Sequence, residues 1–158
     1  MQVAYPEHLR EEIEHYLEAM RFSEDALTAG LEEAMRYSLL AGGKRIRPVL
    51  ALATADAVGL VREEAMPLAG ALELIHTYSL IHDDLPAMDD DSLRRGRPTC
   101  HVAYGEDVAI LAGDGLYAEA FRHLLGEHRS APERLLETAL ELAAATGVDG
   151  MVADSMWM

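Results

Sequence analysis

The chain has 158 residues, half of them hydrophobic, and its 28 acidic against 13 basic residues give a formal net charge of −15. A chain of this length and apolar content can bury one continuous core, so we expect a single domain. The negative charge argues against nucleic acid or an anionic membrane surface as a partner, because both are themselves negatively charged.

The single cysteine, Cys100, excludes an internal disulfide framework, and no spacing of cysteine and histidine is typical of a zinc site. We therefore expect a reducing, cytoplasmic compartment. The first ten residues lack the basic and apolar regions of a signal peptide. Apolar stretches such as residues 108–112 are far shorter than the ~20 residues of a membrane span, so none is expected.

Apolar residues recur at steps of three and four residues and strand signals are nearly absent, so the sequence predicts an all-α fold. Gly43 and Gly59 are typical helix stops. Pro48 suits the first turn of a helix, whereas Pro86 interrupts one. The expected helices cover residues 6–20, 31–40, 48–58, 67–85, 107–125 and 131–146.

The densest chemical signal is the sequence DDLPAMDDD at residues 83–91, which places five aspartates directly after an apolar helix. Like charges at this spacing repel one another unless a cation lies among them. Carboxylate oxygens suit Mg²⁺, which takes one or two protein carboxylates and completes its shell with water and substrate phosphate. An EF-hand calcium site does not fit, because Arg94 would stand at the glycine position and Cys100 at the bidentate glutamate.

Asp83 and Asp89 are six residues apart and would point to different faces of an unbroken helix. If Pro86 lets about two residues loop out, these aspartates become effective i, i+4 neighbours and can hold one cation cluster. The alternative is that the aspartates merely form a polar helix end.

The scarce positive charge is concentrated in two short runs, residues 44–47 and 94–97, which hold six of the thirteen basic residues. Lys44, the only lysine, lies between a glycine pair and a helix start, where backbone N–H groups and the helix dipole favour an anion. The second run closely follows the aspartates, so chelated cations and guanidinium groups can converge on one diphosphate. The alternative is that the arginines pair with surplus carboxylates, above all Arg45 and Arg97.

His76 lies two helical turns before Asp83 and projects from the same helix face, although a lone histidine there is more often a core residue. His82 and Asp83 allow a second enzyme hypothesis, a helical metal-dependent phosphohydrolase. That site would need further histidine ligands, for which only His8, His15 and His76 are candidates. No Gly-x-Ser-x-Gly motif, dinucleotide fingerprint or P-loop occurs.

Together, these motifs resemble the short-chain trans-prenyl diphosphate synthases, the farnesyl and geranylgeranyl diphosphate synthase family. The motifs that match in order and spacing are GGKRIRP at 42–48, HTYSLIHDDLPAMDDD at 76–91, LRRGRPT at 93–99, GED at 105–107 and LAGD at 111–114. The likeness covers about residues 30–152. It implies an all-α isoprenoid synthase (terpenoid synthase) bundle, usually a homodimer, of which residues 1–158 would be the N-terminal part of a single polyprenyl synthase domain.

The resemblance further implies a magnesium-dependent prenyltransferase that condenses isopentenyl diphosphate with an allylic diphosphate. Asp83 and Asp89, with Asp84 assisting, would hold Mg²⁺ against the allylic diphosphate. Arg94 would bind that diphosphate and so share the catalytic role with Asp83 and Asp89. The residues expected to bind isopentenyl diphosphate are Lys44, Arg47, His76 and Arg95.

Product length is limited in this family partly by the residues five and four positions before the first aspartate. Here these residues are Tyr78 and Ser79. The bulk of Tyr78 favours a product of fifteen carbons, with twenty carbons as the alternative.

The family also carries a second aspartate-rich motif on a later helix, which supplies the other half of the magnesium site, and this chain ends before it. We therefore expect residues 1–158 alone to be inactive or severely impaired. The alternative from a different class is a non-catalytic regulatory subunit, which keeps the fold and modifies a catalytic partner.

Overall fold

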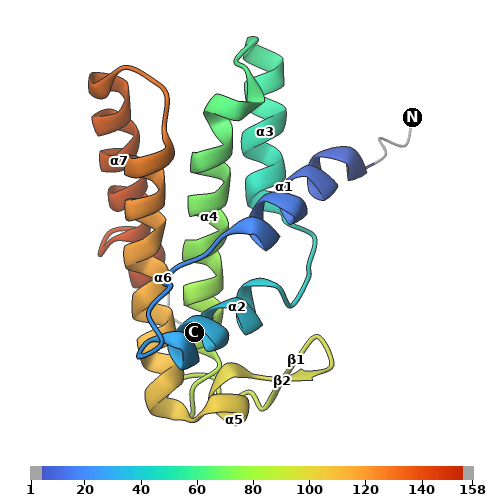
Figure 1. Cartoon of the computed structure of the whole chain (residues 1–158), viewed down its shortest axis with the longest axis vertical. Coiled ribbons are helices and arrows are strands. Elements are labelled where there is room, and N and C mark those ends of the chain that lie inside the picture. The colour runs from blue at the N-terminus through green and yellow to red at the C-terminus, as the bar shows by residue number, and fades with distance from the viewer. Residues whose placement is uncertain (1–4, 155–158) are drawn as a thin grey trace.

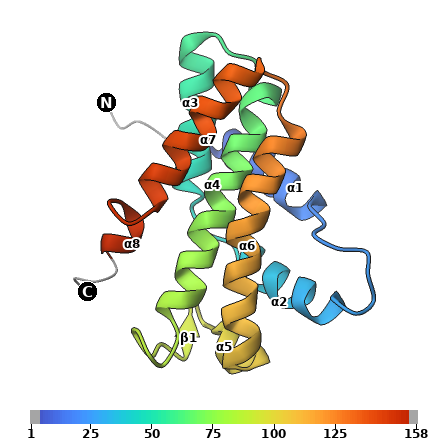
Figure 2. The ribbon, with the colours of Figure 1, turned by 90° about the vertical axis from the view of Figure 1, so that its left-hand side faces the viewer.

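The structure, a computed structural model that describes residues 5–154, is built almost entirely from helices. The helices are α1 (Glu7–Ala19), α2 (Ala29–Leu39), α3 (Ile46–Val58), α4 (Arg62–Asp83), α5 (Cys100–Tyr104), α6 (Glu106–Glu127), α7 (Pro132–Thr146) and α8 (Met151–Asp154), and the strands are β1 (Leu93–Arg94) and β2 (Arg97–Pro98). Helices α3, α4 and α6 run side by side along the long axis, and α1 and α2 cross one side of them (Figure 1, Figure 2).

The centre of the bundle is the antiparallel pair α4 and α6 (Figure 1). Each helix has 22 residues, which gives a length of about 33 Å. Their contact is close because the imidazole of His82 on α4 packs where Gly113 on α6 has no side chain. Helix α1 adds its apolar face, with Leu9, Ile13 and Leu17 buried at four-residue steps.

The fourth helix differs from the predicted span. Helix α4 begins at Arg62 rather than at 67, and Pro67 is buried in its second turn. Proline is expected at a first turn, so its position pointed to a later start. The helix also ends at Asp83, before Pro86, which leaves the remaining aspartates in a loop.

A hairpin and a short helix occupy the region between the predicted helices. The antiparallel strands β1 and β2 pair Leu93 with Pro98 and Arg94 with Arg97. Arg95 and Gly96 form the turn with φ of 54° and 76°, the left-handed pair of a type I′ turn. Together with α5, this hairpin covers the lower end of the bundle in Figure 1, next to the C-terminal end of α4.

Candidate active site

The aspartate-rich loop follows the C-terminal end of α4. Beyond Asp83 the chain turns around Pro86 and returns, so that the backbone N–H of Asp89 donates to the carbonyl oxygen of Asp83 at 2.9 Å. The excursion therefore makes neighbours of two aspartates that are six residues apart. Burial first, and the Asp89 carboxylate second, raise the pKa of Asp83. This pair carries a repulsion that a cation would relieve.

Asp84 is paired with Arg94. Only 3% of Asp84 is exposed, and its carboxylate accepts hydrogen bonds from Arg94 Nη2 at 2.7 Å and from Nε at 2.9 and 3.1 Å. Within residues 5–154, no three or more histidine, cysteine, aspartate or glutamate side chains converge as a metal cluster. Of the three aspartates predicted as metal ligands, Asp84 is thus engaged by Arg94, while Asp83 and Asp89 lie together in the loop.

The four side chains expected to bind isopentenyl diphosphate line one cavity of about 360 Å³. Lys44 and Arg47 come from the start of α3, His76 comes from α4, and Arg95 comes from the hairpin turn. The rest of the lining consists of Gly43, Arg45, Ile46 and Glu73. Three segments that are distant in sequence therefore line one cavity, and two of them contribute cationic side chains.

The hairpin reaches this cavity through a contact between Arg95 and Gly43. A Cβ atom on Gly43 would lie 2.8 Å from Cζ of Arg95, so the guanidinium occupies space that any other residue would fill. Gly43 also has a φ of 140°, which side chains rarely tolerate. This glycine lets the two basic runs of the sequence meet.

The pKa of His76 reflects its burial and the positive charge of the cavity. Burial first, followed by the charges of Arg47 and Arg95, lowers the pKa of His76 to about 4. The imidazole is therefore neutral at pH 7 and can donate or accept a hydrogen bond. The surrounding positive charge favours an anion with several negative charges.

The hairpin itself is held by α2. The hydroxyl of Tyr37 donates to the Pro98 carbonyl at 2.8 Å, and the guanidinium of Arg97 lies 4.5 Å from the centre of the Tyr37 ring. Arg97 thus supports the hairpin and does not line the cavity of Lys44. Arg45 also has internal partners, Glu14 and Glu73. Arg45 therefore follows the alternative of pairing with carboxylates, whereas Arg97 contacts an aromatic ring instead.

Tyr78 lies in an aromatic row between α4 and α6. Its ring meets His82 edge-on at 5.2 Å and Tyr117 at 5.1 Å, and Tyr117 continues to Phe121 at 5.4 Å. Ser79 instead donates its hydroxyl to the His76 carbonyl at 2.9 Å. The sequence analysis missed Tyr117 and Phe121, although their four-residue spacing on α6 places them on one face.

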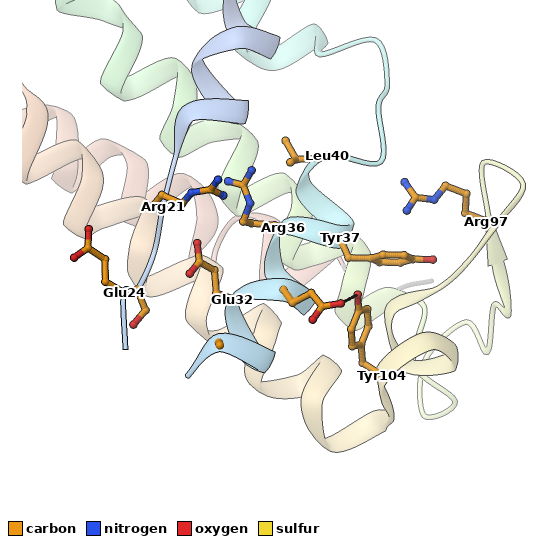
Figure 3. A pocket seen from close by; sticks show the side chains of 11 residues that line it. Arg21, Glu24, Glu32, Arg36, Tyr37, Leu40, Arg97 and Tyr104 are labelled. Carbon is orange, nitrogen blue, oxygen red and sulfur yellow. Dashed lines mark hydrogen bonds between the residues drawn. The ribbon is translucent and has the colours of Figure 1, made fainter. Parts of the chain in front are cut away.

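A larger cavity of about 670 Å³ lies on the other side of α2, and none of the predicted site residues lines it (Figure 3). The guanidinium groups of Arg21 and Arg36 point toward each other there, and Glu24 and Glu32 also line the cavity. Because the charges are mixed, this cavity lacks the positive excess that surrounds His76.

Comparison with known proteins assigns the family. The Polyprenyl synthetase family model matches residues 28–157. The chain belongs to the polyprenyl synthetase family. The family prediction from the motifs is thereby confirmed.

Relatives of this chain include two chloroplastic plant proteins. The geranylgeranyl pyrophosphate synthase of Capsicum annuum is 57% identical over 124 residues, which cover 78% of this chain and 34% of the relative. The heterodimeric geranylgeranyl pyrophosphate synthase large subunit 1 of Arabidopsis thaliana is 57% identical over 126 residues, with the same two coverages. The chain spans about a third of the length of these relatives.

Solved structures confirm the isoprenoid synthase fold. An FPP/GFPP synthase from Zymomonas mobilis superimposes with a TM-score of 0.88 at 43% identity, covering 95% of this chain and 54% of that one. A geranyltransferase from Legionella pneumophila gives a TM-score of 0.84 at 38% identity, covering 96% of this chain and 53% of that one. This polyprenyl synthetase chain therefore corresponds to about half of either structure.

No helix within the described residues 5–154 is long and apolar enough to cross a membrane. The cytoplasmic location stays a prediction, since both plant relatives are chloroplastic.

Proposed function

We propose that the protein is a magnesium-dependent prenyltransferase, which joins isopentenyl diphosphate to an allylic diphosphate and yields a product of fifteen or twenty carbons. The observation that carries this proposal is the cavity in which Lys44, Arg47, His76 and Arg95 meet. The names of the relatives support it, since these are geranylgeranyl pyrophosphate synthases and an FPP/GFPP synthase.

In this proposal the cavity holds the diphosphate of isopentenyl diphosphate. Lys44 contributes a point charge, whereas Arg47 and Arg95 offer paired N–H donors that match phosphate oxygens. The neutral imidazole of His76 adds a hydrogen bond without further charge repulsion. Anchoring the diphosphate would hold the alkene end of the molecule in one place relative to the allylic partner.

Asp83 and Asp89 fit a Mg²⁺ ion, because Mg²⁺ takes one or two carboxylates and because burial, and then the Asp89 carboxylate, raise the pKa of Asp83. When bound, Mg²⁺ would stabilise the negative charge on the diphosphate that leaves the allylic substrate. Arg94 gives Nε and Nη2 to Asp84, which leaves Nη1 to donate to that same diphosphate.

The product length belongs to the same proposal. Tyr78 and Tyr117 would form the wall that a growing prenyl chain meets. The bulk of Tyr78 supports fifteen carbons, and the names of the plant relatives support twenty. Tyr78→Ala should lengthen the product seen by mass spectrometry. An unchanged product would show that Tyr78 does not limit the chain length.

The alternatives have weaker support. A phosphohydrolase needs His82 as a metal ligand, but its Nε2 lies 3.1 Å from the Ile110 carbonyl, to which it donates when protonated. A regulatory subunit finds some support in the Arabidopsis relative, whose name describes one subunit of a heterodimer. We propose a homodimer, and light scattering of the purified protein would distinguish it from a monomer or a mixed assembly.

Prenyl transfer tests the proposal directly. Labelled isopentenyl diphosphate and geranyl diphosphate, incubated with the protein and Mg²⁺, should yield an extractable prenyl diphosphate when the opposing half of the site is present. Removing Mg²⁺ with EDTA, or substituting Asp83→Ala, should abolish the product. A preparation that binds both substrates and Mg²⁺ without forming product would overturn the catalytic proposal in favour of a regulatory role.

A further inference from the structure

The loop that carries Lys44 and leads into α3, where Arg47 lies, has an unusual backbone. Gly42, Gly43 and Arg45 have φ of 78°, 140° and 50°, so three residues of a four-residue stretch adopt positive φ. Arg45 is not a glycine, and the left-handed conformation costs it roughly 1 kcal/mol. Because local preferences do not favour this path, contacts from elsewhere in the fold must hold the loop.

Those contacts converge on the side chain of Arg45, which is 2% exposed. Its Nε and Nη2 donate to the two carboxylate oxygens of Glu14 at 2.9 and 3.1 Å. Its Nη1 donates to Glu73 at 2.6 Å, and Nη2 also donates to the Leu39 carbonyl at 2.8 Å. One guanidinium thus joins α1, α2 and α4 at the start of α3.

The N-terminal segment makes a second contact with the same loop. The hydroxyl of Tyr5 donates to the backbone carbonyl of Lys44. Tyr5 and Glu14 both precede residue 28, where the match to the family model begins. Two side chains outside that match therefore hold the carbonyl of Lys44 and the side chain of the next residue, Arg45.

We propose that Glu14 and Tyr5 are positioning residues, through which the N-terminal segment sets the affinity of the cavity for the diphosphate of isopentenyl diphosphate. This inference rests on the proposed function. Glu14 acts through Arg45, whose neighbours in the chain include Lys44 and, two residues on, Arg47. The Arg45–Glu14 pair is bidentate, with side chains 2% and 21% exposed, so it fixes the orientation of the guanidinium better than a fully exposed pair would.

The competing explanation is that Glu14 affects binding through charge alone, and the two explanations predict opposite signs. Glu14→Gln removes a negative charge near a cationic cavity, so charge alone would strengthen the binding of an anion. Loss of positioning would weaken it. Glu11→Gln is the matched control, since Glu11 lies on the same helix, is exposed and makes the same change in net charge.

Calorimetry with inorganic pyrophosphate tests the inference on the chain as it stands, because the cavity is lined wholly by its own residues. We expect the Kd to rise about ten-fold for Glu14→Gln, by analogy with the loss of residues that orient ligands. Tyr5→Phe should raise it by a smaller factor, and Glu11→Gln should leave it unchanged or lower. Glu14→Asp, which retains the charge, should recover part of the affinity.

The outcomes separate the two proposals. Failure of the wild-type protein to bind pyrophosphate would overturn the proposed function. Binding by the wild type and equal or tighter binding by Glu14→Gln would overturn only the positioning role. If Glu14→Gln does not fold, the Kd of Tyr5→Phe tests the positioning role instead. This substitution should leave the fold intact, because Tyr5 is 39% exposed and phenylalanine keeps its ring. In the active enzyme, the KM for isopentenyl diphosphate should rise while the KM for the allylic substrate stays constant.

Discussion

At the residue scale, the pKa values of two side chains of the site are shifted in the direction that favours the uncharged form. Burial, then Arg47 and Arg95, lower the pKa of His76, and burial, then Asp89, raise the pKa of Asp83. The field is therefore positive around His76 and negative around Asp83. A diphosphate would supply the opposite charge at His76, and a magnesium ion would supply it at Asp83.

Pyrophosphate should raise the pKa of His76 from about 4 toward its ordinary value of 6.5. In the free protein the pKa of His76 is lower in the folded state than in the unfolded state. Its contribution to the free energy of unfolding is therefore fully present above pH 6.5 and is lost as the pH falls toward 4. NMR titration of the imidazole, with and without pyrophosphate, measures the change. His123 is an internal control, because its pKa is also lowered but its partner is Tyr16, outside the cavity. If the pKa of His76 stays the same in protein saturated with pyrophosphate, the assignment of the site is contradicted.

Gly43→Ala should raise the Kd for isopentenyl diphosphate by about ten-fold, the loss of roughly one charge-assisted hydrogen bond. The new Cβ would lie 2.8 Å from Cζ of Arg95 and would displace the guanidinium. Gly42→Ala is the control, since Gly42 also has a positive φ, of 78°, but its Cβ would meet nothing within 4 Å. Equal effects of both substitutions in calorimetry would assign the loss to backbone strain rather than to Arg95.

At the scale of the element, the sequence predicted helix ends where glycine dictates the backbone. Gly59 ends α3 with a φ of 73°, as expected. The start of α4 was predicted wrongly, because Pro67 is typical of a first turn and here sits in the second. The hairpin was missed because Arg95 occupies the first left-handed position, where asparagine or glycine would mark the turn.

Part of the candidate site could also be predicted from the sequence. The motifs predicted that Lys44, His76 and Arg95 would act together, and the structure places them in one cavity. They could not predict the pairs of Arg45 with Glu14 and Glu73, which are 31 and 28 residues away. Contacts of this range depend on helix packing and leave no periodic trace in the sequence.

Gly113→Ala should destabilise the protein, although alanine is the better helix former by about 1 kcal/mol. The new Cβ would lie 2.5 Å from Cδ2 of His82, and overpacking of this kind costs about 1–3 kcal/mol. Gly126→Ala, on the same helix with nothing within 4 Å, should leave the Tm unchanged or raise it. Thermal melts compare the two, and a Gly113→Ala protein that melts at or above the wild type would show that His82 moves freely.

At the scale of the whole molecule, the chain supplies the two candidate subsites unequally. The cavity around His76 is lined entirely by described residues of this chain, whereas at the aspartate loop the carboxylates of Asp83 and Asp89 lie close enough to repel each other. The solved structures that it resembles are nearly twice as long. We therefore expect this chain to bind the diphosphate of isopentenyl diphosphate on its own, and to need an opposing wall for the allylic substrate.

The concentration of basic residues around His76, on a chain with a net charge of −15, also has a kinetic consequence. An anionic substrate is repelled at long range and attracted only near the cavity. Raising the ionic strength from about 0.01 to 0.1 M shortens the Debye length from about 30 to 10 Å, and so screens the distant repulsion more than the contact attraction. Stopped-flow measurements should therefore show association with pyrophosphate becoming faster over this range, whereas a uniformly basic protein would show it becoming slower.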